Sequence, residues 1–182
     1  MAFIFTVEDG TGLAGANSYA SVAEADDYFA GRLYSTAWTA ASSADKEKAL
    51  VLASLAIDAQ VRFHGGRFSQ EQGLQWPRVQ CPDPDWKEET VSASDEEGFL
   101  ASGEVPKLVK QAACEMAKEF LTVDRTLTEN EGVSQISLPG AFHVQLQPKD
   151  RRPILSRLVI SMVSRYGQVV TNGSGVARLV RT

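Results

Sequence analysis

The feature that most constrains the fold is the stretch from Ala49 to Ala59, which is apolar on nearly every side. Its spacing predicts a helix over about Lys46 to Phe63, opened by Ser42-Ser43-Ala44-Asp45 and interrupted on its apolar surface only by Ser54 and Asp58. A helix without a polar face has to be packed on more than one side. We therefore expect this helix at the centre of a helical domain, or between the subunits of an oligomer.

Three further segments show the spacing of amphipathic helices. The first opens at a capping box formed by Ser21 and Glu24, and the second runs from about Pro106 to Val123. The third begins at Pro153 and ends at Gly167, with arginines opposite its apolar stripe. The apolar stripe of the first helix consists of Val22, Ala25, Phe29 and Leu33.

Between residues 132 and 147 the helical spacing gives way to alternation with a period of two. Phe142, Val144 and Leu146 form one face of a strand, and the turn pair Pro139-Gly140 joins it to a partner at Ile136–Leu138. The fold class we expect is mainly α: a small bundle of about four helices with a β-hairpin and an extended C-terminal arm. Residues 1–166 form the domain, residues 80–104 a long acidic loop within it, and residues 167–182 the arm.

Positive charge is concentrated at the C-terminal end of the chain. From Lys149 onward there are seven basic residues and one acid, a charge of +6, whereas residues 1–148 carry 11 basic and 22 acidic residues, a charge of −11. Such asymmetry points to a partner that is met by one end of the molecule. We also expect a protein lacking Gln168–Thr182 to fold but to be unable to dock onto its partner.

The sequence contains no recognisable catalytic or metal-binding arrangement. Its two histidines, His64 and His143, are far apart, its two cysteines, Cys81 and Cys114, form no motif, and we expect both to be structural thiols. No phosphate-binding glycine loop or nucleophile motif occurs. We therefore expect a protein that is not an enzyme and has no cofactor, metal or membrane span, and that is soluble and made in the cytoplasm.

One cluster of arginines and aromatic residues fits single-stranded DNA binding, which needs a basic groove with stacking rings. Its members, all within 17 positions, are Arg62, Phe63, Arg67, Phe68, Trp76 and Arg78. The alternative is an aromatic-anchored loop whose arginines pair with the acidic stretch. The same two interpretations, packing within the chain or contact with a partner, stay open for Trp86 and Phe99 in the acidic loop.

The order of the segments resembles a known family. Asn17-Ser18-Tyr19 leads into the Ser21–Phe29 helix, the central helix carries Ala56-Ile57-Asp58, Leu74-Gln75-Trp76-Pro77-Arg78 follows, and Val105-Pro106 opens the next helix. This arrangement resembles the head–tail connector (adaptor) proteins of tailed bacteriophages, a group to which the label DnaT-like single-stranded DNA-binding is also given. The resemblance covers residues 17–78 and 105–123 best, and the Gln-Trp-Pro-Arg run is its most distinctive part.

The resemblance implies a structural component of the virion neck, assembled in the host cytoplasm. It implies a homo-oligomeric ring, typically of twelve copies, that joins the portal protein to the next neck or tail-completion protein, with DNA passing through the lumen without sequence specificity. The alternative is a single-stranded DNA-binding protein of the DnaT-like type. The expected portal-binding arm comprises Val169, Val170, Val176, Arg178, Leu179, Val180 and Arg181. The expected subunit or partner contacts are Trp76, Arg78, Trp86, Phe99, Arg151, Arg152 and Arg157.

Overall fold

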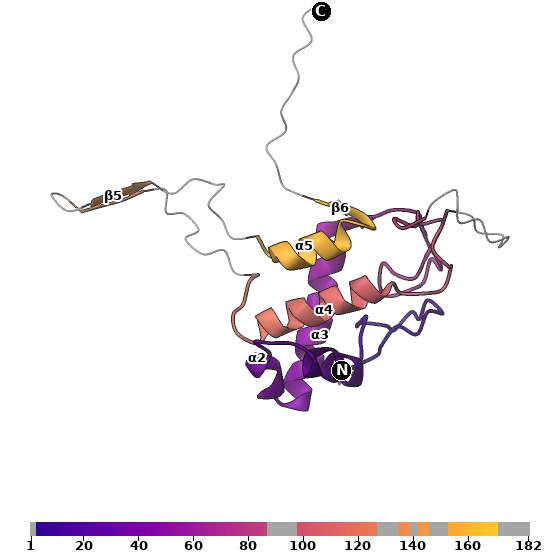
Figure 1. Cartoon of the computed structure of the whole chain (residues 1–182), viewed down its shortest axis with the longest axis horizontal. Coiled ribbons are helices and arrows are strands. Elements are labelled where there is room, and N and C mark those ends of the chain that lie inside the picture. Colours follow the sequence, from indigo (N-terminus) through magenta and orange to yellow (C-terminus); the bar gives the residue numbers. More distant parts are fainter. Residues whose placement is uncertain (1–2, 87–97, 127–134, 139–141, 146–152, 171–182) are drawn as a thin grey trace, which may run out of the picture.

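The computed structural model describes residues 3–86, 98–126, 135–138, 142–145 and 153–170 (Figure 1). Within these residues the chain is mainly helical, with a β-hairpin and two further pairs of short strands, so the expected fold class is confirmed. The helices are α1 (Val22–Ala30), α2 (Thr36–Thr39), α3 (Ser43–Gln60), α4 (Lys107–Phe120) and α5 (Arg157–Val163). The strands are β1 (Val61–Phe63), β2 (Gly66–Arg67), β3 (Arg78–Val79), β4 (Gln135–Leu138), β5 (Phe142–Gln145) and β6 (Gly167–Val169).

The predicted central helix is confirmed as α3, which runs through the middle of the body while α4 and α5 cross it (Figure 1). Its most extensive contacts are with α4, and the two helices meet largely through alanines, which let the backbones approach closely. The buried residues at the core of this pair include Ala49, Ala53, Ala56, Ala112, Ala113 and Ala117. The Ser42 hydroxyl caps α3 by accepting the Asp45 N–H at 3.2 Å, as the sequence indicated.

Helix α1 begins with the predicted capping box. The Ser21 hydroxyl accepts the Glu24 N–H at 3.1 Å, and the Glu24 carboxylate accepts the Ser21 N–H at 2.7 Å. The helix ends at Ala30, however, so Leu33 is not part of its apolar stripe and is 82% exposed. The short helix α2, which the sequence analysis did not predict, then buries Trp38 against the core.

Three other helix boundaries differ from the prediction. The central helix ends at Gln60 because the chain continues as β1, and Phe63 belongs to that strand. Helix α5 begins at Arg157, behind the N-cap Ser156, and not at Pro153. Gly167 does not end this helix, since α5 stops at Val163 and Gly167 is the first residue of β6.

The predicted hairpin is confirmed as β4 and β5, which pair antiparallel with Ile136 opposite Val144 and Leu138 opposite Phe142. The other two strand pairs were not predicted. β1 pairs antiparallel with β6, and β2 pairs antiparallel with β3, each over two or three residues. Because β6 pairs with the body, the first residues of the predicted arm, Gly167–Val169, are part of the folded domain.

Candidate nucleic-acid interface

Two segments of the chain that meet where α3 runs into β1 and α5 runs into β6 carry an excess of positive charge. Residues 59–80 and 153–170 together hold five arginines and one acid, Glu71, a net charge of +4. Residues 3–58, which form α1, α2, the N-terminal loop and nearly all of α3, hold eight acids and three bases, a net charge of −5. The fold therefore places a basic region of the chain against an otherwise acidic body.

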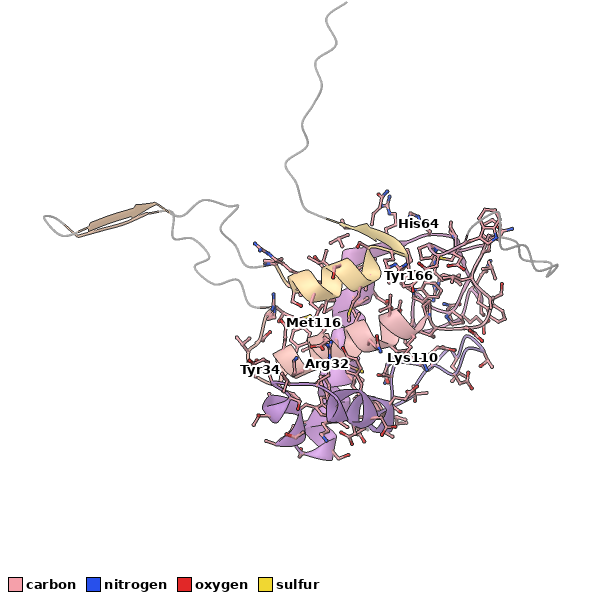
Figure 2. All side chains as sticks on the ribbon, viewed as in Figure 1. Arg32, Tyr34, His64, Lys110, Met116 and Tyr166 are labelled. Carbon is pink, nitrogen blue, oxygen red and sulfur yellow. The ribbon has the colours of Figure 1, made fainter. Side chains whose placement is uncertain are left out.

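The two strands of the β1–β6 pair divide their side chains between the core and solvent. Val61 and Phe63 are buried, whereas Arg62 and Gln168, which lie opposite each other in the register, are exposed. His64 follows on the same outer face and is exposed. Its backbone N–H donates to the Tyr166 carbonyl at 2.9 Å. Figure 2 shows His64 and Tyr166 beside β6, at the end of the body away from α1 and α2. We call the solvent-facing residues Arg62, His64, Arg165 and Gln168 the basic end.

Arg62 is an exposed cation of the basic end. It forms no salt bridge with any residue that the structure describes, whereas Arg32, Lys46, Lys48, Lys110, Lys118, Arg125 and Arg165 each pair with a carboxylate. A guanidinium on a strand face, without a carboxylate partner, is free to donate two parallel hydrogen bonds to a phosphate.

The other two arginines of the predicted DNA-binding cluster donate to carbonyls of the chain itself, although Arg67 is exposed and only Arg78 is buried. Arg78 is buried, and its guanidinium donates to the His64 and Gly65 carbonyls at 2.6 Å each and to the Gln75 carbonyl at 3.0 Å. Arg67 donates to the Gln72 carbonyl. These bonds satisfy the carbonyls of a loop with little regular structure, so both arginines hold the loop together.

The aromatic residues of that cluster are also mostly internal. Trp76 has no exposed surface, and its ring meets the edges of Phe63 and Tyr166 at centroid distances of 5.6 and 6.0 Å. Phe68 alone remains half-exposed. The six-residue cluster is therefore no open groove, and Trp76 packs within the chain, in agreement with the alternative of an aromatic-anchored loop.

A second aromatic residue reaches this end from the acidic loop. Pro82 and Phe99 form an isolated β-bridge, and the Asp83 N–H donates to the Gly98 carbonyl at 3.0 Å. The residues on either side of the bridge, 82–86 and 98–100, form what we call the neck of the acidic loop. Trp86 belongs to the neck and is 44% exposed. Such a ring can stack on a base.

An ion pair between Asp85 and Arg165 fixes the neck beside the basic end. Burial raises the pKa of the Tyr166 phenol above its ordinary value, the Arg165 charge opposes the rise, and the Asp85 and Asp83 carboxylates add to it. One of the two interpretations left open by the sequence has the arginines of the cluster pairing with the acidic stretch. In the structure the arginine that pairs with the acidic stretch is Arg165, which lies just after α5. It is 80 positions from Asp85 in the chain, so the sequence gave no local signal of the pair.

The remaining predicted site residues are dispersed. Val169 lies opposite Val61 in the sheet, Val170 and Phe99 are each 45% exposed, and Arg157 is exposed at the start of α5. The predicted positions that lie outside the described residues are Arg151, Arg152, Val176, Arg178, Leu179, Val180 and Arg181. His64, Arg165 and Gln168 were missed, because their position depends on a strand pairing that spans about a hundred residues.

Among the described residues, no group of three or more histidine, cysteine, aspartate and glutamate side chains could hold a metal ion. Cys81 and Cys114 are both free thiols and both buried, as expected. None of the described helices is long and apolar enough to cross a membrane.

Comparison with known proteins gave one positive result. No curated protein and no solved structure matches this chain. A family model described as "Putative DnaT-like ssDNA binding protein" matches residues 1–182, which is the full length of the sequence. The chain therefore belongs to this DnaT-like family.

Proposed function

We propose that the protein binds single-stranded DNA without sequence specificity through its basic end. The observation that carries the proposal is Arg62, an exposed guanidinium of the basic end with no carboxylate partner among the described residues. The description of the family to which the chain belongs supports the same class of ligand.

The chemistry of the basic end suits a phosphate backbone. Arg62 and Arg165 supply fixed positive charge, and Gln168 supplies an amide donor beside Arg62. Trp86, the sequence neighbour of the Asp85 that pairs with Arg165, adds an exposed ring. Stacking and phosphate contacts do not distinguish one base from another, so we expect tolerance of sequence and strong dependence on salt.

The test is fluorescence anisotropy of a labelled oligothymidylate titrated with the full chain at several salt concentrations. Arg62→Gln should weaken binding by about 3- to 10-fold and reduce the slope of log affinity against log salt by about 0.7, the value for one phosphate contact on a single strand. Lys48→Gln is the matched control, because Lys48 is an exposed cation at the acidic end and pairs with Asp45. The proposal fails if the two variants bind equally well, or if the unmodified protein binds no oligonucleotide at low salt.

The second candidate function is the connector ring, which exposed apolar side chains favour. Leu33 and Tyr34 are 82% and 90% exposed between α1 and α2, and Leu55 is 61% exposed on the outer side of α3. Nearby, α2, α3 and the end of α4 line a hollow of about 510 Å³. Its apolar walls include Ala37, Ala40, Leu52, Phe120 and Leu121. Exposed apolar groups next to an apolar hollow are typical of a surface that another protein copy covers.

In this candidate function the protein is a non-enzymatic virion component. Twelve copies would form a ring between the portal protein and the next neck protein, the arm would reach the portal, and DNA would pass through the lumen. Such a ring needs a weak, non-specific contact with DNA, and the acidic body would keep the DNA from adhering to the wall.

Light scattering coupled to size-exclusion chromatography separates the two functions. A monomer that binds oligothymidylate supports the first, and a ring that joins its cognate portal in fixed stoichiometry supports the second. Replacing Leu33 and Tyr34 together by serine should shift a ring toward monomer, whereas serine at Leu158, an exposed residue of α5, should leave its mass unchanged. A ring that survives the double substitution would place the interface elsewhere.

A further inference from the structure

The ion pair between Asp85 and Arg165 places an acid directly on an arginine of the basic end. The two side chains form an ion pair although the residues are 80 positions apart in the chain. Asp85 is 73% exposed and Arg165 is 39% exposed in their side chains, so solvent and ligands reach both partners. A carboxylate and a phosphate offer a guanidinium the same planar pair of acceptor oxygens.

The neck presents Asp85 in this position by local bonds. Asp83 and Asp85 differ in role, since the Asp83 carboxylate already accepts the Asp85 N–H at 2.9 Å and so shapes the turn. The Asp83 N–H is held by Gly98 across the bridge. The Asp85 carboxylate pairs with Arg165, the arginine of the basic end that has a salt bridge to a described residue.

We propose that Asp85 is an intramolecular phosphate mimic, which competes with DNA for Arg165 and lowers the affinity of the basic end. This inference rests on the proposed single-stranded DNA-binding function. The pair is exposed and therefore easily displaced, so the competition weakens binding without blocking it. Displacement of Asp85 by DNA would also release the neck from Arg165 and leave Trp86, its immediate neighbour, next to the incoming strand.

The competition is tested by measuring oligothymidylate affinity for four proteins in a cycle: the unmodified chain, Asp85→Asn, Arg165→Gln and the double variant. Asp85→Asn should tighten binding by about 2- to 5-fold at low salt, since it removes the competing acceptor. In the Arg165→Gln background the same substitution should have little effect, because no guanidinium is left to release. Glu71→Gln is the matched control, since it removes an exposed acid in the same basic region that has no salt bridge to a described residue.

The outcomes separate the inference from the function on which it rests. If Asp85→Asn tightens binding equally with and without Arg165, or no more than Glu71→Gln does, the effect is net charge alone and the mimic is wrong. If the unmodified chain binds no oligonucleotide, or if Arg62→Gln has no effect on its affinity, the proposed function itself is wrong. The mimic is supported only if the gain in affinity from Asp85→Asn requires Arg165. It also requires that binding by the unmodified protein depends on Arg62.

Discussion

Glu115 and Asp58 are both largely removed from solvent, and their surroundings move their pKa values in opposite directions. Glu115 on α4 lies between Arg32 and Lys118, at 2.5 and 2.6 Å, and accepts the Tyr28 hydroxyl at 2.9 Å. Burial alone would raise its pKa, and these partners outweigh burial and lower it. Asp58 accepts the Tyr19 hydroxyl and the Gln75 N–H but has no cation in contact, so burial raises its pKa to about 6.

Replacing Glu115 by glutamine should lower the free energy of unfolding at pH 7 by about 2 kcal/mol, since it leaves Lys118 and Arg32 without their shared acid in a partly buried site. The folded pKa lies below the unfolded value of 4.5, so the stability that Glu115 contributes is present above pH 4.5. It is lost as the pH falls through the folded pKa. Urea unfolding of both proteins between pH 3 and 7 measures the difference. Asp27→Asn, at an exposed acid of α1, is the control and should change stability by less than about 0.5 kcal/mol.

Replacing Asp58 by asparagine should have the opposite pH dependence. The folded pKa of about 6 lies above the unfolded 3.8, so the folded state holds this proton more tightly. The stability it contributes is complete below pH 3.8 and is lost as the pH rises through 6. Relative to Asp58→Asn, the unmodified protein should therefore lose on the order of 3 kcal/mol between pH 4 and 7. A difference between the two proteins that stays constant across this range would mean that Asp58 is not a titrating buried acid.

At the scale of elements, the basic end depends on the pairing of two three-residue strands, and Gly167 is what allows it. A Cβ at this position would lie 2.5 Å from the Arg62 carbonyl oxygen and 2.7 Å from the Phe63 Cα, and both are backbone atoms. We expect Gly167→Ala to separate β6 from β1 and to lower the melting temperature by several degrees, because about 1 kcal/mol shifts the melting temperature of a domain this size by 2–4 °C. Gly66→Ala is the control, since its Cβ would meet only Val79 Cγ2, at 3.5 Å.

All helices except α2, and the β4–β5 hairpin, could be predicted from the sequence, whereas the strands β1, β2, β3 and β6 could not. α1, α3 and α4 each have local signals, such as the Ser21 cap and the apolar spacing, that fix their type and approximate start. β1 continues the apolar run of α3 without a break, and β6 is a glycine followed by two residues. A strand of three residues has no period to detect, and its partner lies about a hundred positions away.

At the scale of the whole molecule, the sequence shows the charge asymmetry directly, but it does not show where the fold brings the charges together. It located the positive charge in the C-terminal segment, yet the fold joins Arg165 of that segment to Arg62, in the chain's first half, at a single basic end. The residues of the predicted arginine–aromatic cluster lie close together in the sequence, but Arg78 and Trp76 are buried in the folded body. Residues that are close in the sequence therefore differ in whether they face solvent or the core, and tertiary packing decides which.

Two truncations should separate the folded body from the arm. A chain ending at Val170 keeps β6 and should unfold at the same temperature as the full chain, whereas a chain ending at Tyr166 lacks β6 and should melt several degrees lower. From the sequence we expect a chain lacking Gln168–Thr182 to fold, and the pairing of Gln168 and Val169 with β1 leads us to expect that it is less stable. The first truncation also removes Arg178 and Arg181 from the sequence. If the arm contacts DNA, the salt dependence of oligothymidylate binding should fall by about 1.4 for these two charges. An unchanged slope would restrict the DNA contact to the basic end, whereas equal melting temperatures for the two truncations would contradict the stabilising role of β6.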